Sequence, residues 1–206
     1  MLKQSSSIRN IQDSFGKLLA AIPLSPNHWT MLSVLIAMAG GFVIAYQTNL
    51  MLGLILFAVA GLFDVIDGAV ARSRKETSEL GGFIDGVADR FVEGIFLLSL
   101  MFYPLPEIFI DSKIWLASVI FLGTCMPSFI RAYADHKGVI SRENALALGG
   151  LCERSERLLI IIAALVFGLS YSMDYFVYGL IAVVVLSFVT IIQRLLQIKK
   201  AAGSGA

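Results

Sequence analysis

Four aspartates beside strongly apolar sequence are the residues of this chain best suited to chemistry. They are Asp64, Asp67, Asp85 and Asp89, in the stretch DVIDGAVARSRKETSELGGFIDGVAD. Read as helix, the first two are at i and i+3 and share one helix face. The last two are at i and i+4 and share a face of the next helix. An ionisable group at membrane depth is costly and normally faces a cavity or a bound ion, so this cluster is the candidate functional site.

The polar segment between the two pairs predicts how they meet. Residues 72–79 are polar and charged, and we expect them to form a turn that brings the two aspartate faces together. Converging carboxylates cannot all stay ionised unless a cation is bound. Oxygen ligands suit Mg²⁺, Mn²⁺ or Ca²⁺ better than zinc, which prefers His and Cys. The sequence therefore predicts a divalent-metal site. Nearby glycines leave room for close helix approach or a bulky ligand: Gly61, Gly68, Gly81, Gly82 and Gly86.

The composition indicates that the elements around this cluster lie in a membrane. Hydrophobic residues make up 57% of the chain and charged residues 15%, and the mean hydropathy is +0.81, which is too apolar for a soluble domain of this length. A net charge of +1 argues against a nucleic-acid partner. Cys125 and Cys152 lack the spacing of a metal site, and we expect both to be small buried side chains. The predicted class is an all-α polytopic membrane protein.

We expect six transmembrane helices preceded by an interfacial amphipathic helix. Residues 1–22 carry an apolar stripe opposite a basic and polar face, which suits a helix on the cytoplasmic surface and is too polar to span. Residues 23–200 would form the membrane domain, and residues 201–206 a linker-like tail. Pro127 would kink the fourth span. The expected spans are residues 31–46, 50–71, 80–103, 114–133, 152–169 and 175–196.

The positions of the basic residues predict the orientation. Only Lys113 falls at the turns after the first, third and fifth spans, and the other Lys and Arg residues lie at the termini, in the remaining loops or at the span ends beside them. Cytoplasmic loops are enriched in Lys and Arg. Both termini and the aspartate site are therefore expected on the cytoplasmic side of a multi-pass protein of the plasma membrane.

The aspartate stretch also resembles a family signature. It is similar to that of the CDP-alcohol phosphotransferases, integral membrane enzymes that build phospholipid head groups. Every position of the signature is filled: Asp64-x2-Asp67-Gly68-x2-Ala71-Arg72-x8-Gly81-x3-Asp85-x3-Asp89. The resemblance implies that an acceptor hydroxyl attacks the β-phosphorus of a CDP-lipid and CMP leaves. It also implies a homodimer.

The resemblance further implies roles for single residues. Asp64, Asp67 and Asp85 would be metal ligands. Asp89 would be the general base and would also touch the second of two Mg²⁺ ions, for which Mn²⁺ could substitute. Two such ions can stabilise the entering and leaving oxygens. The planar fork of Arg72 would bind a phosphate. The residues that would contact the CDP-lipid are Asn27, His28, Trp29, Thr30, Gly68, Arg72 and Ser78.

Three arginines nearer the C-terminus are candidates for the acceptor site. Arg131, Arg154 and Arg157 lie near the cytoplasmic ends of the fourth and fifth expected spans and would bind an anionic group such as a sugar phosphate. Pairing on the helix surface is the alternative. Arg131 and Asp135 are at i and i+4, as are Glu153 and Arg157, and such pairs would satisfy one another.

The segment at the start of the fifth expected span indicates which alcohol is the acceptor. Residues 150–158, GLCERSERL, are similar to the start of the fifth helix in the inositol-phosphate branch of the family, with Ser155 where proline is common. We therefore expect a phosphatidyl-type group, on diacylglycerol or archaeol, to be transferred to inositol phosphate. Glycerol phosphate is the alternative within the family.

A divalent-cation transporter is the alternative from another class. It would also carry acids in membrane helices, but along a path through the bilayer. The aspartates here lie at one depth, beside an arginine and a basic turn. A purely structural membrane protein would need no such cluster, so we predict an enzyme.

Overall fold

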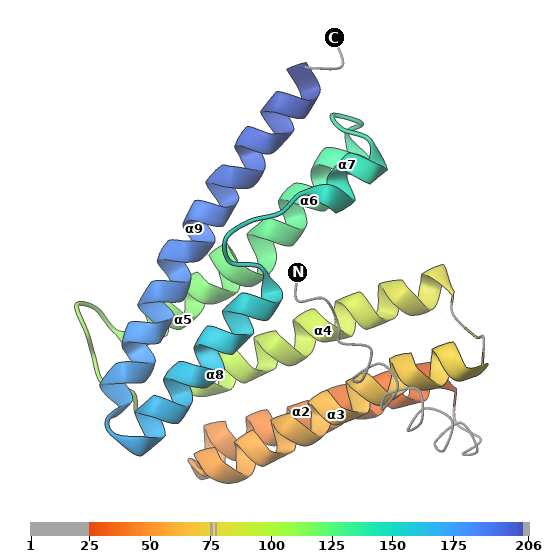
Figure 1. The fold of residues 1–206 in the computed structure, drawn as a ribbon. Coiled ribbons are helices and arrows are strands. Elements are labelled where there is room, and N and C mark those ends of the chain that lie inside the picture. Colours follow the sequence, from red (N-terminus) through yellow and green to blue (C-terminus); the bar gives the residue numbers. More distant parts are fainter. Residues whose placement is uncertain (1–24, 75, 77, 204–206) are drawn as a thin grey trace. The chain divides into compact units, whose positions relative to one another are not determined.

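The computed structural model describes residues 25–74, 76 and 78–203, and nearly all of them are helical (Figure 1). In this part of the chain the one β-type feature is an isolated bridge between Ile108 and Ile110. The predicted all-α class is therefore confirmed. The interfacial helix expected at residues 1–22 lies outside the described residues. The chain divides into two compact units, Met1–Tyr103 and Pro104–Ala206, which are described separately.

The described residues of the first unit form three helices: α2 (Pro26–Gln47), α3 (Leu50–Arg74) and α4 (Glu79–Leu100). Pro26 occupies the first turn of α2, where a missing N–H costs nothing. Thr48, with φ 50°, ends that helix in the left-handed conformation. Helix α2 packs against both α3 and α4 (Figure 1). A Cβ on Gly53 would lie 2.2 Å from Ile44 Cγ1, so glycine is what lets α3 approach α2.

The second unit is also helical. A continuous helical rod consists of α5, the π-helical segment η1 and α6, and helix α9 packs against both this rod and α8 (Figure 1). The helical elements of the second unit are α5 (Ser112–Ser118), η1 (Val119–Cys125), α6 (Met126–His136), α7 (Arg142–Ala147), α8 (Arg154–Ser170) and α9 (Met173–Gly203). Helix α9 thus extends into the segment that we assigned to the tail.

The π-helical segment η1 lies just before Pro127, where we expected a kink. Pro127 has no N–H to donate to the carbonyl of Gly123 four residues earlier. That carbonyl accepts a hydrogen bond from Arg157 Nη1 at 2.7 Å. A Cβ on Gly123 would lie 2.9 Å from Arg157 Cδ, so the glycine admits this side chain. The proline and the glycine together bring α8 against η1.

Four described helical stretches are long and apolar enough to cross a membrane: Pro26–Gln47, Leu50–Arg74, Ser112–His136 and Met173–Gly203. Helices α4 and α8 lie where we expected the other two spans. Helix α8 has 17 residues. Helix α4, with 22 residues, is about 33 Å long, enough for a hydrocarbon core of about 30 Å. It carries five charged residues: Glu79 in its first turn, and Asp85, Asp89, Arg90 and Glu93 further along the helix.

One expectation about the cysteines is wrong. Cys152 is buried, as we predicted, but Cys125 is exposed. Cys125 lies in the long apolar stretch Ser112–His136. A small apolar side chain on the outer face of such a helix can contact lipid at no cost, so an apolar sequence context does not imply burial inside the protein.

Candidate functional site

Three of the four aspartates come together in the first unit. Asp64 and Asp67 project from the C-terminal half of α3, and Asp85 from near the start of α4. One carboxylate oxygen from each lies within 4.8 Å of the other two. Asp67 is buried, with 5% of its surface exposed, and the other two are more accessible. Three oxygen donors at this spacing fit a hard cation such as Mg²⁺ or Mn²⁺, so this aspartate triad (Asp64, Asp67 and Asp85) could hold a metal ion.

Asp89 lies one turn beyond Asp85 on α4 and is outside the triad. It is half-buried, and its charge acts on Asp67. A carboxylate beside the triad is well placed for a different role from that of the three grouped oxygens.

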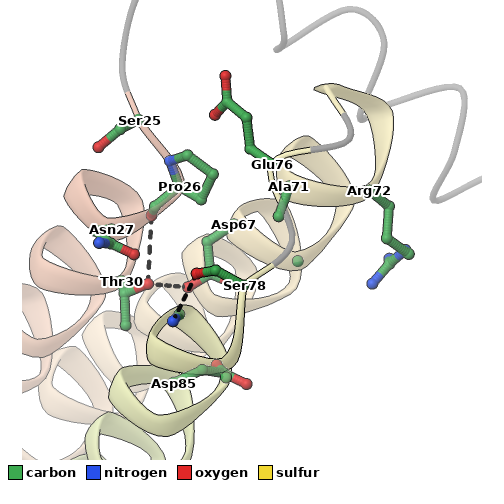
Figure 2. A pocket seen from close by; sticks show the side chains of 13 residues that line it. Ser25, Pro26, Asn27, Thr30, Asp67, Ala71, Arg72, Glu76, Ser78 and Asp85 are labelled. Carbon is green, nitrogen blue, oxygen red and sulfur yellow. Dashed lines mark hydrogen bonds between the residues drawn. The ribbon is translucent and has the colours of Figure 1, made fainter.

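The turn between α3 and α4 reverses the chain where the sequence predicted. Helix α4 starts after Ser78, whose Oγ accepts a hydrogen bond from the Gly81 backbone N–H at 3.0 Å (Figure 2). Such a cap satisfies a backbone donor that the helix itself leaves free. The cap fixes where α4 begins and therefore which face carries Asp85. Ser78, which we predicted as a nucleotide contact, has this structural role as well.

Helix α2 contributes a direct contact to the triad. Thr30 is 5% exposed, and its Oγ1 donates a hydrogen bond to Asp67 Oδ2 at 2.5 Å (Figure 2). We predicted that Thr30 contacts the nucleotide and missed its contact with Asp67. Periodicity shows which residues share a face of one helix, but it does not show which side chain of another helix lies opposite.

A pocket of about 380 Å³ adjoins the triad (Figure 2). Among its lining residues are Asp67 and Asp85 and most of the predicted CDP-lipid contacts: Asn27, Thr30, Gly68, Arg72 and Ser78. Glu76, from the turn, also lines the pocket and was not predicted. The pocket therefore joins a candidate metal site to donors and acceptors that suit a phosphorylated ligand.

His28 and Trp29, also predicted as CDP-lipid contacts, are not among the described residues that line this pocket. His28 is exposed, and its Nδ1 lies 2.6 Å from Ser25 Oγ. Trp29 is 6% exposed and packs on Phe63, with 5.6 Å between ring centroids. These contacts give His28 a surface role and Trp29 a packing role between α2 and α3.

The predicted acceptor arginines all lie in the second unit. Arg157, on α8, is 2% exposed and donates to the Gly123 carbonyl. Arg131, on α6, donates from Nη2 to the Leu148 carbonyl at 3.3 Å. Arg154 is the first residue of α8 and is half-buried. Arg157 and Arg131 therefore hold backbone carbonyls in addition to any role in binding.

A buried arginine on α9 was missed by the sequence analysis. Arg194 is 3% exposed, donates from Nη1 to the Pro127 carbonyl at 2.5 Å, and places Nη2 3.7 Å from Glu153 Oε1. The charges of Arg131 and Arg157 both act on it. Glu153, for which we considered a pair with Arg157, thus bonds Arg194. A lone arginine within an apolar span was the signal that could have identified it.

Comparison with known sequences gives the family. The model of the CDP-alcohol phosphatidyltransferase family matches residues 23–192. The archaetidylinositol phosphate synthase of Pyrococcus horikoshii is 31% identical over 188 residues, which cover 91% of this chain and 90% of that protein. The archaetidylinositol phosphate synthase of Methanothermobacter thermautotrophicus is 30% identical over 178 residues, covering 86% and 84%.

Solved structures share the fold. The Mycobacterium tuberculosis phosphatidylinositol phosphate synthase with CDP-DAG bound gives a TM-score of 0.75 at 24% identity, covering 92% of this chain and 94% of that chain. The same enzyme in complex with manganese and citrate gives 0.76 at 23% identity, covering 94% and 91%. The sequence match over most of the chain, together with the filled aspartate signature, shows that this protein belongs to the CDP-alcohol phosphatidyltransferase family.

Proposed function

We propose that this protein transfers a phosphatidyl-type group from a CDP-lipid to a hydroxyl of inositol phosphate and releases CMP. The observation that carries the proposal is the aspartate triad, whose three carboxylate oxygens lie within 4.8 Å of one another and of which Asp67 and Asp85 line a pocket of about 380 Å³. Relatives that match most of the chain are named archaetidylinositol phosphate synthases, which supports the acceptor.

The proposed cofactor is a pair of Mg²⁺ ions, with Mn²⁺ able to replace them. Asp64, Asp67 and Asp85 would hold the metal, and Asp89 would complete the second position. Bound metal would neutralise the pyrophosphate and stabilise the entering and leaving oxygens. The manganese complex of the Mycobacterium tuberculosis enzyme supports a divalent metal in this fold.

The chain's own residues bind the CDP-lipid and move one proton. Arg72 would pair with a phosphate of the pyrophosphate through its planar fork. A Cβ on Gly68 would lie 3.1 Å from Arg72 Nη1, so the absence of a side chain at Gly68 gives the guanidinium room at the pocket wall. Asp89 would accept the proton of the acceptor hydroxyl while that oxygen forms its bond to the β-phosphorus. The bond from that phosphorus to the CMP oxygen breaks.

The acceptor phosphate is assigned to Arg131, Arg154 and Arg157. Arg194, on which the charges of Arg131 and Arg157 both act, would add a further guanidinium to the group. Charged hydrogen bonds from several arginines suit a phosphate monoester better than a neutral alcohol such as serine. Glycerol phosphate remains the second candidate because it carries the same group.

The topology proposed with this function has six spans, with both termini and the aspartate site on the cytoplasmic side of the plasma membrane, and a homodimer as the assembly. Four long apolar helices and the length of α4 support the span number. The distribution of Lys and Arg supports the orientation.

The direct test uses purified protein in nanodiscs. It would be supplied with CDP-diacylglycerol or CDP-archaeol and, in separate reactions, inositol phosphate, glycerol phosphate and serine, and CMP release would be measured. We expect release with inositol phosphate that depends on Mg²⁺. CMP release with glycerol phosphate but not with inositol phosphate would identify glycerol phosphate as the acceptor. No CMP release with any acceptor, together with uptake of Mn²⁺ into proteoliposomes, would overturn the proposal in favour of a transporter.

A further inference from the structure

We infer that Thr30 is a positioning residue of the metal site: its hydroxyl, supplied by α2, fixes the Asp67 carboxylate for metal binding. The inference rests on the proposed function, because it takes Asp67 to be a metal ligand. It assigns to Thr30 a role that is separate from any contact with the CDP-lipid.

The geometry determines where the single hydroxyl proton of Thr30 goes. Thr30 Oγ1 lies 2.5 Å from Asp67 Oδ2 and 3.3 Å from the Pro26 carbonyl oxygen. One hydroxyl can donate only one hydrogen bond, and the bond to a carboxylate is both the shorter and the stronger. The proton therefore points at Asp67, and the carbonyl of Pro26 keeps only a weak contact (Figure 2).

The burial of both partners makes this bond a constraint. Thr30 and Asp67 are each 5% exposed, so water does not readily replace either one. A hydrogen bond to Oδ2 limits rotation of the carboxylate and leaves the direction of its other oxygen fixed. Partners that orient a ligand in this way are generally needed for full metal affinity. Helix α2, which contributes no aspartate to the triad, thus helps to shape it.

A second hydrogen bond between the same two helices provides a matched control. Ser33 lies on α2 close to Thr30 in sequence, is 1% exposed, and donates to the Ala60 carbonyl of α3 at 2.8 Å. Ala60 carries no ligand atom and precedes the triad. Ser33→Ala therefore removes a buried bond between α2 and α3 without touching the candidate metal site.

The experiment measures Mn²⁺ binding by electron paramagnetic resonance on purified full-length protein, without CDP-lipid. Thr30→Val keeps the shape and removes the hydroxyl, and we expect its Kd for Mn²⁺ to rise about 10- to 100-fold. Thr30→Ser restores the hydroxyl and should bind within a few fold of the original protein. Ser33→Ala should lower the Tm and leave the Kd unchanged. If Thr30→Val is not monodisperse, Thr30→Ala removes the same hydroxyl and carries the same expectation.

The outcomes separate this inference from the function on which it rests. Asp67→Asn should lose Mn²⁺ binding, and unchanged binding in that variant would refute the proposed metal site itself. If Asp67→Asn loses binding while the Thr30 variants bind as tightly as the original protein, the positioning role is wrong and the metal site stands. A higher KM for CDP-lipid at saturating Mg²⁺, with unchanged Mn²⁺ binding, would instead make Thr30 a nucleotide contact only.

Discussion

At the scale of single residues, the site divides its carboxylates into two kinds. The aspartate triad gathers three oxygens, and the buried Asp67 is held by a hydrogen bond from another helix. Asp89 stands beside this group, one turn further along α4. A base must exchange a proton with the acceptor, and a ligand must keep its charge on the metal. The separate placement of Asp89 fits the role of base, which we propose for it beside its contact with the second metal position.

Replacement of Asp89 tests this division. Asp89→Asn should retain binding of CDP-lipid and lower the rate of CMP release about 10²- to 10⁴-fold, the usual contribution of a positioned base. Asp64→Asn is the contrast, because it should weaken metal and nucleotide binding as well as turnover. Binding and turnover would be measured on the same preparations. Turnover of Asp89→Asn at the original rate would show that the base lies elsewhere.

The arginines of the second unit allow a test of the acceptor. Loss of a charged hydrogen bond to a phosphate costs about 1.5–3 kcal/mol, or about 10- to 150-fold in affinity. Arg131→Gln and Arg154→Gln should therefore raise the KM for inositol phosphate and leave the KM for CDP-lipid nearly unchanged. Arg157→Gln should also lower stability, since Arg157 is buried on the Gly123 carbonyl. An unchanged acceptor KM in the first two variants would remove inositol phosphate as the favoured acceptor.

At the scale of elements, helix α9 holds the segment that leads into α8. Thr190, Gln193 and Gln197 lie on one face of α9 and accept hydrogen bonds from backbone N–H groups within residues 149–152, at 2.9, 2.8 and 3.3 Å. The segment is irregular, so these side chains supply bonds that a helix or strand would otherwise provide. They thereby set where α8, with Arg154 and Arg157, begins.

Residues 149–152 approach α9 closely, and this contact leads to a prediction about stability. A Cβ on Gly150 would lie 2.2 Å from Thr190 Cγ2, so Gly150→Ala should lower the free energy of unfolding by about 1–3 kcal/mol through overpacking. Thr190→Ser removes that methyl group and keeps the hydroxyl. Thermal unfolding of both single variants and the double variant would measure the coupling. Strict additivity of the two effects would contradict the predicted clash.

The sequence predicted elements better than it predicted the contacts between them. Each expected span has a helix, because long apolar runs bounded by prolines and charges are visible in a single chain. The first span was expected from residue 31, whereas α2 begins at Pro26, because proline suits a first helical turn. The aspartates were found from spacing within one helix. Thr30 and Arg194 act across helices, and their partners depend on how each helix is rotated.

At the scale of the whole molecule, activity should depend on a removable cation. Extensive dialysis against EDTA should abolish CMP release, and added Mg²⁺ or Mn²⁺ should restore it, since several carboxylates converge in the first unit. CMP release by a sample loaded with Ca²⁺ would serve as a control, because it shows whether neutralising the carboxylate charge is enough for activity. Full activity in EDTA after dialysis would contradict metal-assisted transfer.

The proposed orientation makes a separate prediction. In a variant whose native cysteines are replaced by serine, a cysteine placed at Lys113 should react with an impermeant maleimide added outside intact cells. A cysteine at Lys200 should react only after the cells are opened, because the basic C-terminal end of α9 is expected in the cytoplasm. The reverse labelling pattern would invert the topology.

The charges that mark α4 have a consequence for how the protein is made. One charged residue at the centre of a helix disfavours its insertion by about 2.5–3.5 kcal/mol, and α4 carries five charged residues, four of them beyond its first turn. In the proposed topology, α4 would be a poor substrate for the insertion machinery when presented alone. Helix α2 packs against it and is apolar enough to insert first. Biogenesis of α4 should therefore wait for α2 and α3, so the residues that we propose for catalysis would also impose an order of assembly during synthesis.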